Sequence, residues 1–144
     1  MSQIVFVLNG PNLNLLGTRE PDIYGSDTLD DIAGRLDDLA RPLGLTVDLR
    51  QSNHEGHLID WLHEAQAREA RGVILNAGAL THTSIGLHDA IKAVRTPVVE
   101  VHLSNPHTRE AFRHRSYVGM ACKGTIAGLG ALGYELALQA ISRW

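Results

Sequence analysis

A short apolar run, IVFVL at residues 4–8, decides the fold class of this chain. The run is unbroken, whereas a strand with one face in water alternates apolar and polar residues. We therefore expect this strand to be covered on both faces, which is typical of a parallel sheet. Similar or weaker strand patterns recur at residues 45–49, 73–75, 98–101 and 124–127.

Helical patterns lie between these strands. Apolar residues recur three and four positions apart within residues 29–40, 58–65, 85–94 and 134–144. Thr28 and Asp31 predict a capping box at the start of the first of these helices. Strands that alternate with helices build a parallel sheet. Five such strands predict an α/β fold, a three-layer, flavodoxin-like, doubly wound parallel sheet with strand order 2-1-3-4-5.

Composition narrows the classes of function. The 144 residues fit one domain, which we expect to span residues 1–144. A net charge of -3 argues against a nucleic-acid partner, and no stretch reaches the ~18 apolar residues of a membrane span. The run at residues 4–8 is too short for a signal peptide, and the single cysteine, Cys122, cannot form an internal disulfide. We expect a cytoplasmic protein.

The connection between the first strand and the first helix, residues 9–27, is unusually long. Most such connections contain ~2–6 residues, and longer ones are often lids or binding loops. This one contains Arg19, Glu20 and Tyr24, together with glycines. A passive surface loop remains an alternative, but we expect residues 17–27 to form a mobile cover over a site.

Polar residues gather where the predicted strands end. In an open α/β sheet, ligands bind beyond the carboxyl ends of the strands, at the point where the strand order reverses. The first, third and fourth strands are neighbours there, and all three lead into polar residues. These are Asn9, Asn12, Asn76, Thr81, His82, Thr83, Ser84, Glu100, His102, Ser104 and Asn105. Such groups orient a polar, hydroxylated ligand through hydrogen bonds.

Arginines follow the fourth strand. Arginine accounts for eleven of the thirteen basic residues, and it suits bidentate capture of a carboxylate or phosphate. We expect Arg113, on a short helix, to face the site. Arg109 and Arg115 are expected to form surface ion pairs.

Other sequence motifs do not indicate a binding or catalytic site. The G-x-G-x-x-G at Gly128, Gly130 and Gly133 lacks a following strand and the acidic residue of a dinucleotide site, so it predicts a tight strand-to-helix turn. The chain has neither a phosphate-loop motif nor a G-x-S-x-G elbow. A surface metal contact at His54 and His57 is conceivable from their spacing, but a solvated helix face is the preferred interpretation.

Six segments together resemble type II 3-dehydroquinate dehydratases, the type II dehydroquinases of the shikimate pathway. The longest is IVFVLNGPNLNLLGTREPDIYG at residues 4–25, which is highly specific. The others are QSNHEG at 51–56, ILNAGALTHTS at 74–84, VEVHLSN at 99–105, REAFRHRS at 109–116 and GTIAGLGALGY at 124–134. The resemblance covers essentially the whole chain.

This resemblance implies a hydro-lyase that removes water from 3-dehydroquinate by anti elimination through an enolate, giving 3-dehydroshikimate without a cofactor or metal. Tyr24 would be the base, or proton acceptor, and His102 the proton donor. Arg19 would lower the pKa of Tyr24 and stabilise the transition state. Asn12 would hold a water that stabilises the enolate, and Glu100 would orient His102.

The resemblance also implies which residues bind the substrate and how the chains assemble. The substrate hydroxyls and carboxylate would be bound by Asn76, His82, Leu103, Ser104 and Arg113. Asp89 would reach into the site of a neighbouring subunit, in a homo-oligomer of trimers arranged into a dodecamer. His57 stands where the family often has Glu, and Gly119 where it often has Ser; we expect neither departure to affect the chemistry.

The chemistry of these side chains is consistent with such roles. A phenol titrates near pH ~10, so it becomes a useful base at neutral pH only where a nearby cation stabilises its anion. Arginine remains charged throughout, and histidine can carry a proton at physiological pH. Glu100 and His102 are two apart on a strand, so they point to the same face.

Other interpretations remain open from the residues alone. Tyr24 could be a turn aromatic, Asn12 and Asn76 could cap loops, and Asp89 could be a solvated surface acid. A flavodoxin-like flavin-binding protein is the main alternative function, although no Ser/Thr-rich phosphate-binding loop follows the first strand. A receiver or scaffold domain is a third, but the first strand ends without an acidic cluster.

Overall fold

Five parallel strands form one sheet in the order β2-β1-β3-β4-β5 in a computed structural model that describes residues 3–18 and 20–144. The predicted fold class and strand order are confirmed. The strands are β1 (Gln3–Asn9), β2 (Leu45–Gln51), β3 (Gly72–Asn76), β4 (Val98–His102) and β5 (Gly124–Ala127). In β1 the register places Asn9 beside Gln51 on one side and Asn76 on the other, so polar residues line up at the carboxyl edge.

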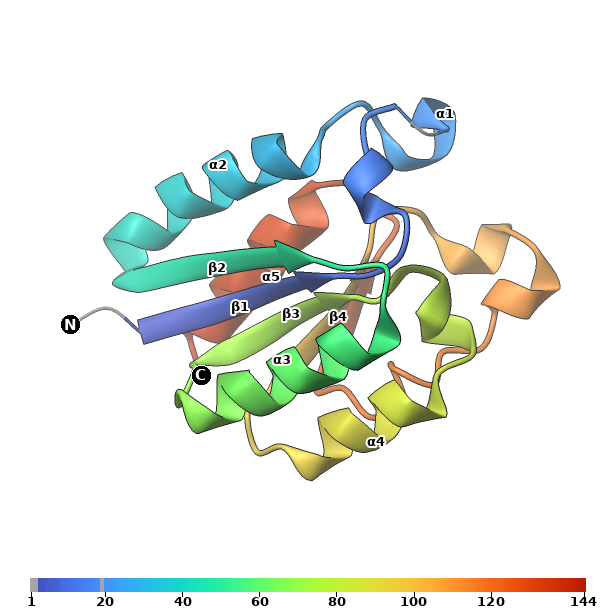
Figure 1. The fold of residues 1–144 in the computed structure, drawn as a ribbon. Helices are drawn as coiled ribbons and strands as arrows, with labels where there is room; N and C mark the ends of the chain where they lie inside the picture. The colour runs from blue at the N-terminus through green and yellow to red at the C-terminus, as the bar shows by residue number, and fades with distance from the viewer. Residues whose placement is uncertain (1–2, 19) are drawn as a thin grey trace.

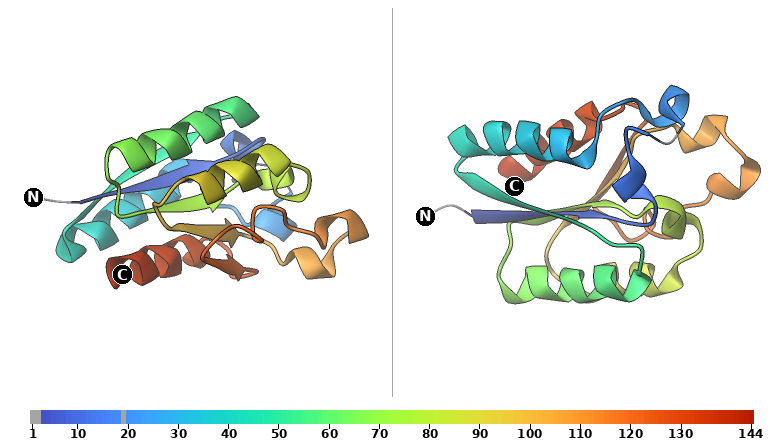
Figure 2. Two further views of the ribbon diagram at one scale, coloured as in Figure 1. Left: turned by 90° about the horizontal axis from the view of Figure 1, so that it is seen from below. Right: turned by 45° about the horizontal axis from the view of Figure 1, so that its top comes forward.

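Four long helices cover the two faces of the sheet. Helices α2 (Leu29–Ala40) and α5 (Leu132–Ser142) pack on one face, and α3 (Glu55–Ala67) and α4 (Ile85–Ala93) pack on the other (Figures 1 and 2). The predicted capping box is present, since the Thr28 hydroxyl accepts from the Asp31 backbone N–H and the Asp31 carboxylate accepts from that of Thr28. The last helix ends at Ser142, so Trp144 lies beyond it.

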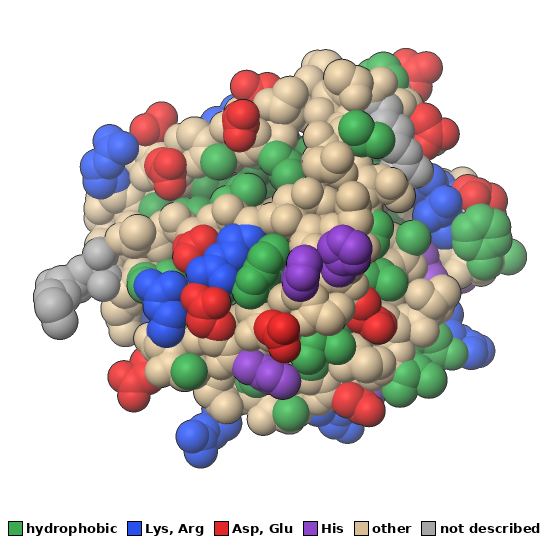
Figure 3. Space-filling view, in the orientation of Figure 1, with side chains coloured by type: hydrophobic (Ala, Val, Ile, Leu, Met, Phe, Trp, Pro, Cys, Tyr) green, Lys and Arg blue, Asp and Glu red, His purple; other side chains and the backbone are tan. Residues whose placement is uncertain are grey.

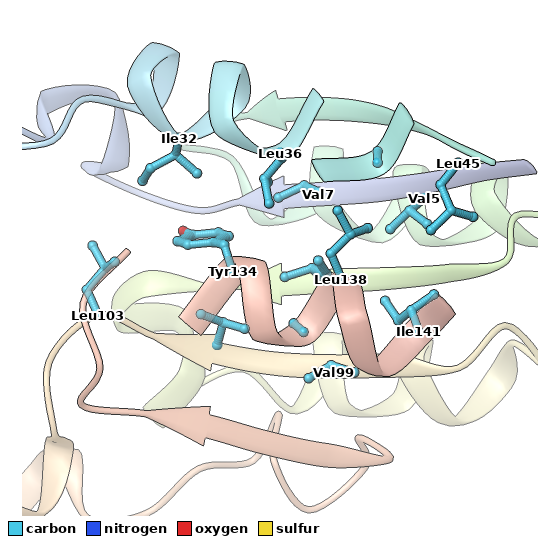
Figure 4. Close-up of a cluster of buried hydrophobic side chains, with 14 of the residues drawn as sticks. Val5, Val7, Ile32, Leu36, Leu45, Val99, Leu103, Tyr134, Leu138 and Ile141 are labelled. Atoms are coloured by element: carbon cyan, nitrogen blue, oxygen red, sulfur yellow. The ribbon is translucent and has the colours of Figure 1, made fainter. Parts of the chain in front are cut away.

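The core has two halves because successive residues of a strand point to opposite faces. Val5 and Val7 pack toward α2 and α5, in the cluster that Figure 4 shows around Tyr134. Phe6 and Leu8 pack toward α3 and α4. The unbroken apolar run therefore fills both halves of the core, as expected for a strand buried on both faces.

The long connection after β1 contains local structure that the sequence analysis does not predict. A 3-10 turn, η1 (Leu13–Leu15), follows β1, and a short helix, α1 (Pro21–Tyr24), precedes α2. Leu13 and Leu16 are buried in the core and anchor the first part of the connection. Arg19 lies outside the described residues.

Further short turns connect the other elements. They are η2 (Arg41–Leu43), η3 (Gly78–His82), η4 (Pro106–Thr108) and η5 (Ala111–Arg113). Three of them, η3, η4 and η5, follow β3 and β4 at the carboxyl edge of the sheet, where Figure 1 shows short helical segments beyond the strand ends. Among the described residues, no helix has the length and apolar character needed to cross a membrane.

Candidate active site

A pocket lies at the carboxyl edge of the sheet, between the segments that follow β1, β3 and β4. Most of the predicted site residues line it. These are Asn12, Tyr24, Asn76, His82, His102, Leu103, Ser104 and Arg113. The remaining lining comes from Pro11, Leu13, Gly78, Ala79, Pro106 and Arg109. The strand order thus brings together residues as far apart in the sequence as Pro11 and Arg113.

Two predicted residues that the structure describes, Glu100 and Asp89, do not line this pocket. Glu100 lies directly behind His102. Asp89 is exposed on α4, away from the pocket of its own chain. Arg19 falls on a position that the structure does not describe.

The segments after β1 and β3 touch each other at Gly10. The Gly10 N–H donates to the Asn76 carbonyl at 2.8 Å, and a Cβ on Gly10 would lie 2.4 Å from the Ala77 carbonyl oxygen. Only glycine permits this approach. The next turn holds Asn12 in a left-handed conformation, φ 69°, and its N–H donates to the Asn53 side-chain oxygen at 3.0 Å.

Glu100 and His102 form a buried pair on β4. The Nε2 of His102 lies 2.8 Å from a carboxylate oxygen of Glu100, whose side chain is only 2% exposed. Ser116 and Thr125 hydroxyls also donate to this carboxylate, at 2.5 and 2.8 Å. Burial alone would raise the pKa of Glu100, but these hydrogen bonds and the nearby imidazole outweigh burial and hold it below its ordinary value. This carboxylate holds the ring of His102 in a fixed orientation.

Gly119 belongs to the surroundings of this pair, although the sequence analysis gives it no role. A Cβ at Gly119 would lie 2.5 Å from a Glu100 carboxylate oxygen. The Gly119 N–H donates to the Ser116 hydroxyl at 2.7 Å, and that hydroxyl donates to Glu100. The departure from the family pattern therefore falls beside the candidate acid.

His82 lies beside His102, with the two rings stacked at a centroid distance of 6.5 Å. Its Nδ1 donates to the Arg115 carbonyl at 2.8 Å, which leaves Nε2 as an acceptor in the neutral ring. Burial lowers the pKa of His82, so the neutral form is favoured. His82 is thus suited to accept a hydrogen bond from a ligand hydroxyl.

Arg109 is the site residue that the sequence analysis misses. It forms an ion pair with Glu110 at 3.9 Å, as expected, but its side chain is only 14% exposed and lines the pocket. Its guanidinium lies 5.1 Å from the centre of the Tyr24 ring and donates to the Ser104 hydroxyl at 3.1 Å. The predicted surface position is therefore wrong.

The turn η4 explains the position of Arg109. The Asn105 side chain accepts from the His107 N–H, and Pro106 begins the turn, so the chain reverses after β4. Asn105 and Pro106 in the sequence signal such a turn. Arg113 also lines the pocket, paired with Glu110 at 3.3 Å, whereas Arg115 is exposed and donates to the Tyr117 hydroxyl.

The arrangement is suited to proton transfer on an anionic, hydroxylated ligand. A phenol and a carboxylate-bound histidine line the same pocket and can serve as base and acid. Two arginines can bind a carboxylate. The described residues bring no three His, Cys, Asp or Glu side chains together in a metal-binding arrangement.

Comparisons with known proteins place this site in a family. The family model described as Dehydroquinase class II matches residues 3–142. A 3-dehydroquinate dehydratase of Hyphomonas neptunium is 62% identical, covering 99% of this chain and 95% of that protein, and one of Rhizobium johnstonii is 60% identical, covering 98% and 97%. The crystal structure of a type II dehydroquinase from Propionibacterium acnes superposes with a TM-score of 0.95 at 46% identity, covering 100% of this chain and 99% of that one. The chain belongs to the class II dehydroquinase family.

Proposed function

We propose that this protein is a 3-dehydroquinate dehydratase of the shikimate pathway, a hydro-lyase that converts 3-dehydroquinate to 3-dehydroshikimate. The observation that carries the proposal is the meeting of Tyr24 and the Glu100–His102 pair at one pocket of a class II dehydroquinase fold. Family membership favours this activity over the flavin-binding alternative, because the matched model covers nearly the whole chain.

The reaction begins with proton removal. The phenolate oxygen of Tyr24 takes a proton from the carbon next to the ketone, and the electron pair moves onto the ketone oxygen as an enolate. Asn12 holds a water that donates to this oxygen. Positive charge beside the ring stabilises the phenolate, and we assign that role to Arg19 and, from its place over the ring, to Arg109.

The second step expels the hydroxyl group. The enolate collapses, the carbon–oxygen bond on the neighbouring carbon breaks, and His102 gives a proton to the departing oxygen, which leaves as water. Because Nε2 of His102 is held by Glu100, this proton comes from Nδ1. Proton return from Tyr24 to His102 through solvent restores the enzyme.

The other pocket residues bind the substrate. Asn76, His82, and the backbone and side chain of Leu103 and Ser104 face the hydroxyl groups, and Arg113 binds the carboxylate. Residues 17–27 cover the pocket during turnover and keep water away from the enolate. Asp89 completes the site of a neighbouring subunit in a homo-oligomer built from trimers.

The base can be tested with Tyr24→Phe. This variant lacks the phenolic oxygen, so we expect kcat to fall by roughly a thousandfold or more, while the affinity for 3-dehydroquinate stays within a few-fold of the parent. Turnover is followed by the ultraviolet absorbance of the conjugated enone product, and binding by calorimetry. Tyr117→Phe, which removes the hydroxyl of a tyrosine outside the pocket, is the matched control. Near-normal turnover by Tyr24→Phe would exclude Tyr24 as the base.

A further inference from the structure

Tyr134 lies in the core beneath the pocket, and its hydroxyl joins the ends of two strands. The ring belongs to α5 and is completely buried among the aliphatic side chains that Figure 4 shows. Its hydroxyl donates to the side-chain oxygen of Asn9 at 2.6 Å. It accepts from the side-chain nitrogen of Asn76 at 2.9 Å. Asn9 ends β1 and Asn76 ends β3, so this one hydroxyl connects the two strands at the carboxyl edge.

The backbone fixes the direction of this chain of hydrogen bonds at both ends. The Asn9 side-chain nitrogen donates to the Arg50 carbonyl at 3.1 Å and the Val7 carbonyl at 3.4 Å, so its oxygen must face Tyr134. The Asn76 side-chain oxygen accepts from the Gly78 N–H at 3.2 Å, so its nitrogen must face Tyr134. Reversal of either amide would set donor against donor or acceptor against acceptor in a buried site.

This direction determines what Asn76 offers to the pocket. One of its two N–H groups is used by Tyr134, and its oxygen is held by Gly78, so the second N–H is left in a fixed orientation where Asn76 lines the pocket. Burial raises the pKa of Tyr134, so its hydroxyl keeps the proton that it donates to Asn9.

We propose that Tyr134 and Asn9 are positioning residues for the dehydratase reaction: their buried hydrogen bonds hold the Asn76 amide so that one N–H points at a substrate hydroxyl. This inference rests on the proposed function. Neither residue lines the pocket, and both act through Asn76. Without the Tyr134 hydroxyl, the Asn76 nitrogen and the Asn9 oxygen lose their shared partner, and only the hydrogen bond from the Gly78 N–H still orients the Asn76 side chain.

A double-mutant cycle tests this coupling. The four proteins are the parent, Tyr134→Phe, Asn76→Ala and the double variant. We expect Tyr134→Phe to lower kcat/KM about tenfold in the parent, mainly through KM, and by less than about twofold when Asn76 is already alanine. Ile141→Val, which removes one methylene from the same core without touching these hydrogen bonds, is the control for lost stability and should keep the parent kcat/KM.

Crystal structures of the parent and of Tyr134→Phe give a readout that does not depend on activity. We expect one Asn76 side-chain conformation in the parent and a rotated or multiple conformation in the variant. The same conformation in both, equal losses of kcat/KM in both backgrounds, or parent-like kcat/KM for Asn76→Ala would each overturn the inference. If the parent does not turn over 3-dehydroquinate but Asn76 rotates in the variant, the proposed function fails while the positioning of Asn76 stands.

Discussion

The ring of Tyr24 lies beneath the guanidinium of Arg109, which keeps its charge throughout the pH range of a folded protein. That charge lies over the ring of the proposed base and lines the pocket that takes the anionic substrate. We therefore expect Arg109→Gln to lower kcat/KM by roughly ten- to a hundredfold, because the pocket loses a charged hydrogen-bond donor. Steady-state kinetics that follow the absorbance of the enone product measure this loss.

Arg115→Gln is the matched control for that measurement. Arg115 also lies over a tyrosine ring, 5.8 Å from the centre of Tyr117, but it is exposed and its side chain does not line the site. Its replacement should leave kcat/KM unchanged. A parent-like kcat/KM for Arg109→Gln as well would show that Arg109 has no part in the reaction.

Individual residues could be placed from the sequence where they lie on a strand, but not where they follow a turn that reverses the chain. Glu100 and His102 could be paired from the sequence because alternation along a strand fixes their common face. Arg109 and Gly119 could not be placed, because their positions depend on how the turns after β4 fold back onto the sheet. Nothing local in the sequence distinguishes Arg109 from a solvated arginine.

At the scale of elements, strand β2 and helix α3 are joined by charged side chains. Arg50 binds Asp48 at 2.9 Å and Glu64 at 2.6 Å, and Arg68 adds a bond to Glu64 at 3.1 Å. The Arg50 guanidinium also lies over the Phe6 ring, at 4.8 Å. Figure 3 shows acidic and basic groups together over β2 and α3. This cluster joins the edge strand β2 to the helix that packs on the same face of the sheet.

Glu64→Gln tests what this cluster contributes. The hydrogen bond from Arg50 lowers the pKa of Glu64 from 4.5 to about 2, so its stabilising effect is full above pH 4.5 and is lost as the pH falls toward 2. Because the pair is partly open to water, we expect the variant to lose about 1 kcal/mol of unfolding free energy at pH 7. Urea unfolding at several pH values should show this difference shrinking below pH 4.5. Asp60→Asn, exposed on the same helix, is the control; a pH-independent difference would contradict the assignment.

The regular elements could be predicted because each repeats a simple pattern over several residues. The bounds of β5 and the cap of α2 follow from such local signals. The helix α1 has only four residues and begins at Pro21, which is too short for a period of 3.6 to appear. Its helical form depends on its surroundings, and the sequence predicts only a loop there.

At the scale of the whole molecule, one face of helix α4 is exposed in the single chain although it carries an apolar side chain. Ile85 and Asp89 are four residues apart on α4, so they share a face, and both are exposed. Two more apolar side chains, Phe112 and Met120, are also mostly exposed, in segments between β4 and β5. A bond from His88 to the Tyr117 carbonyl, at 2.7 Å, ties α4 to one of those segments. Apolar surface of this kind is typical of contacts between chains.

Asp89→Ala tests whether this face meets a second copy of the chain. If Asp89 completes a neighbouring site, its replacement removes a charged hydrogen bond between subunits. We then expect either a KM for 3-dehydroquinate about tenfold above that of the parent or a smaller assembled mass. The increase in KM should appear only where the subunits are assembled. Light scattering measures the mass, and steady-state kinetics on the same sample measure KM. Asp37→Ala, which removes an exposed acid from α2, should change neither. Parent mass together with parent KM for Asp89→Ala would place Asp89 in solvent, and the site would then have to be complete within one chain.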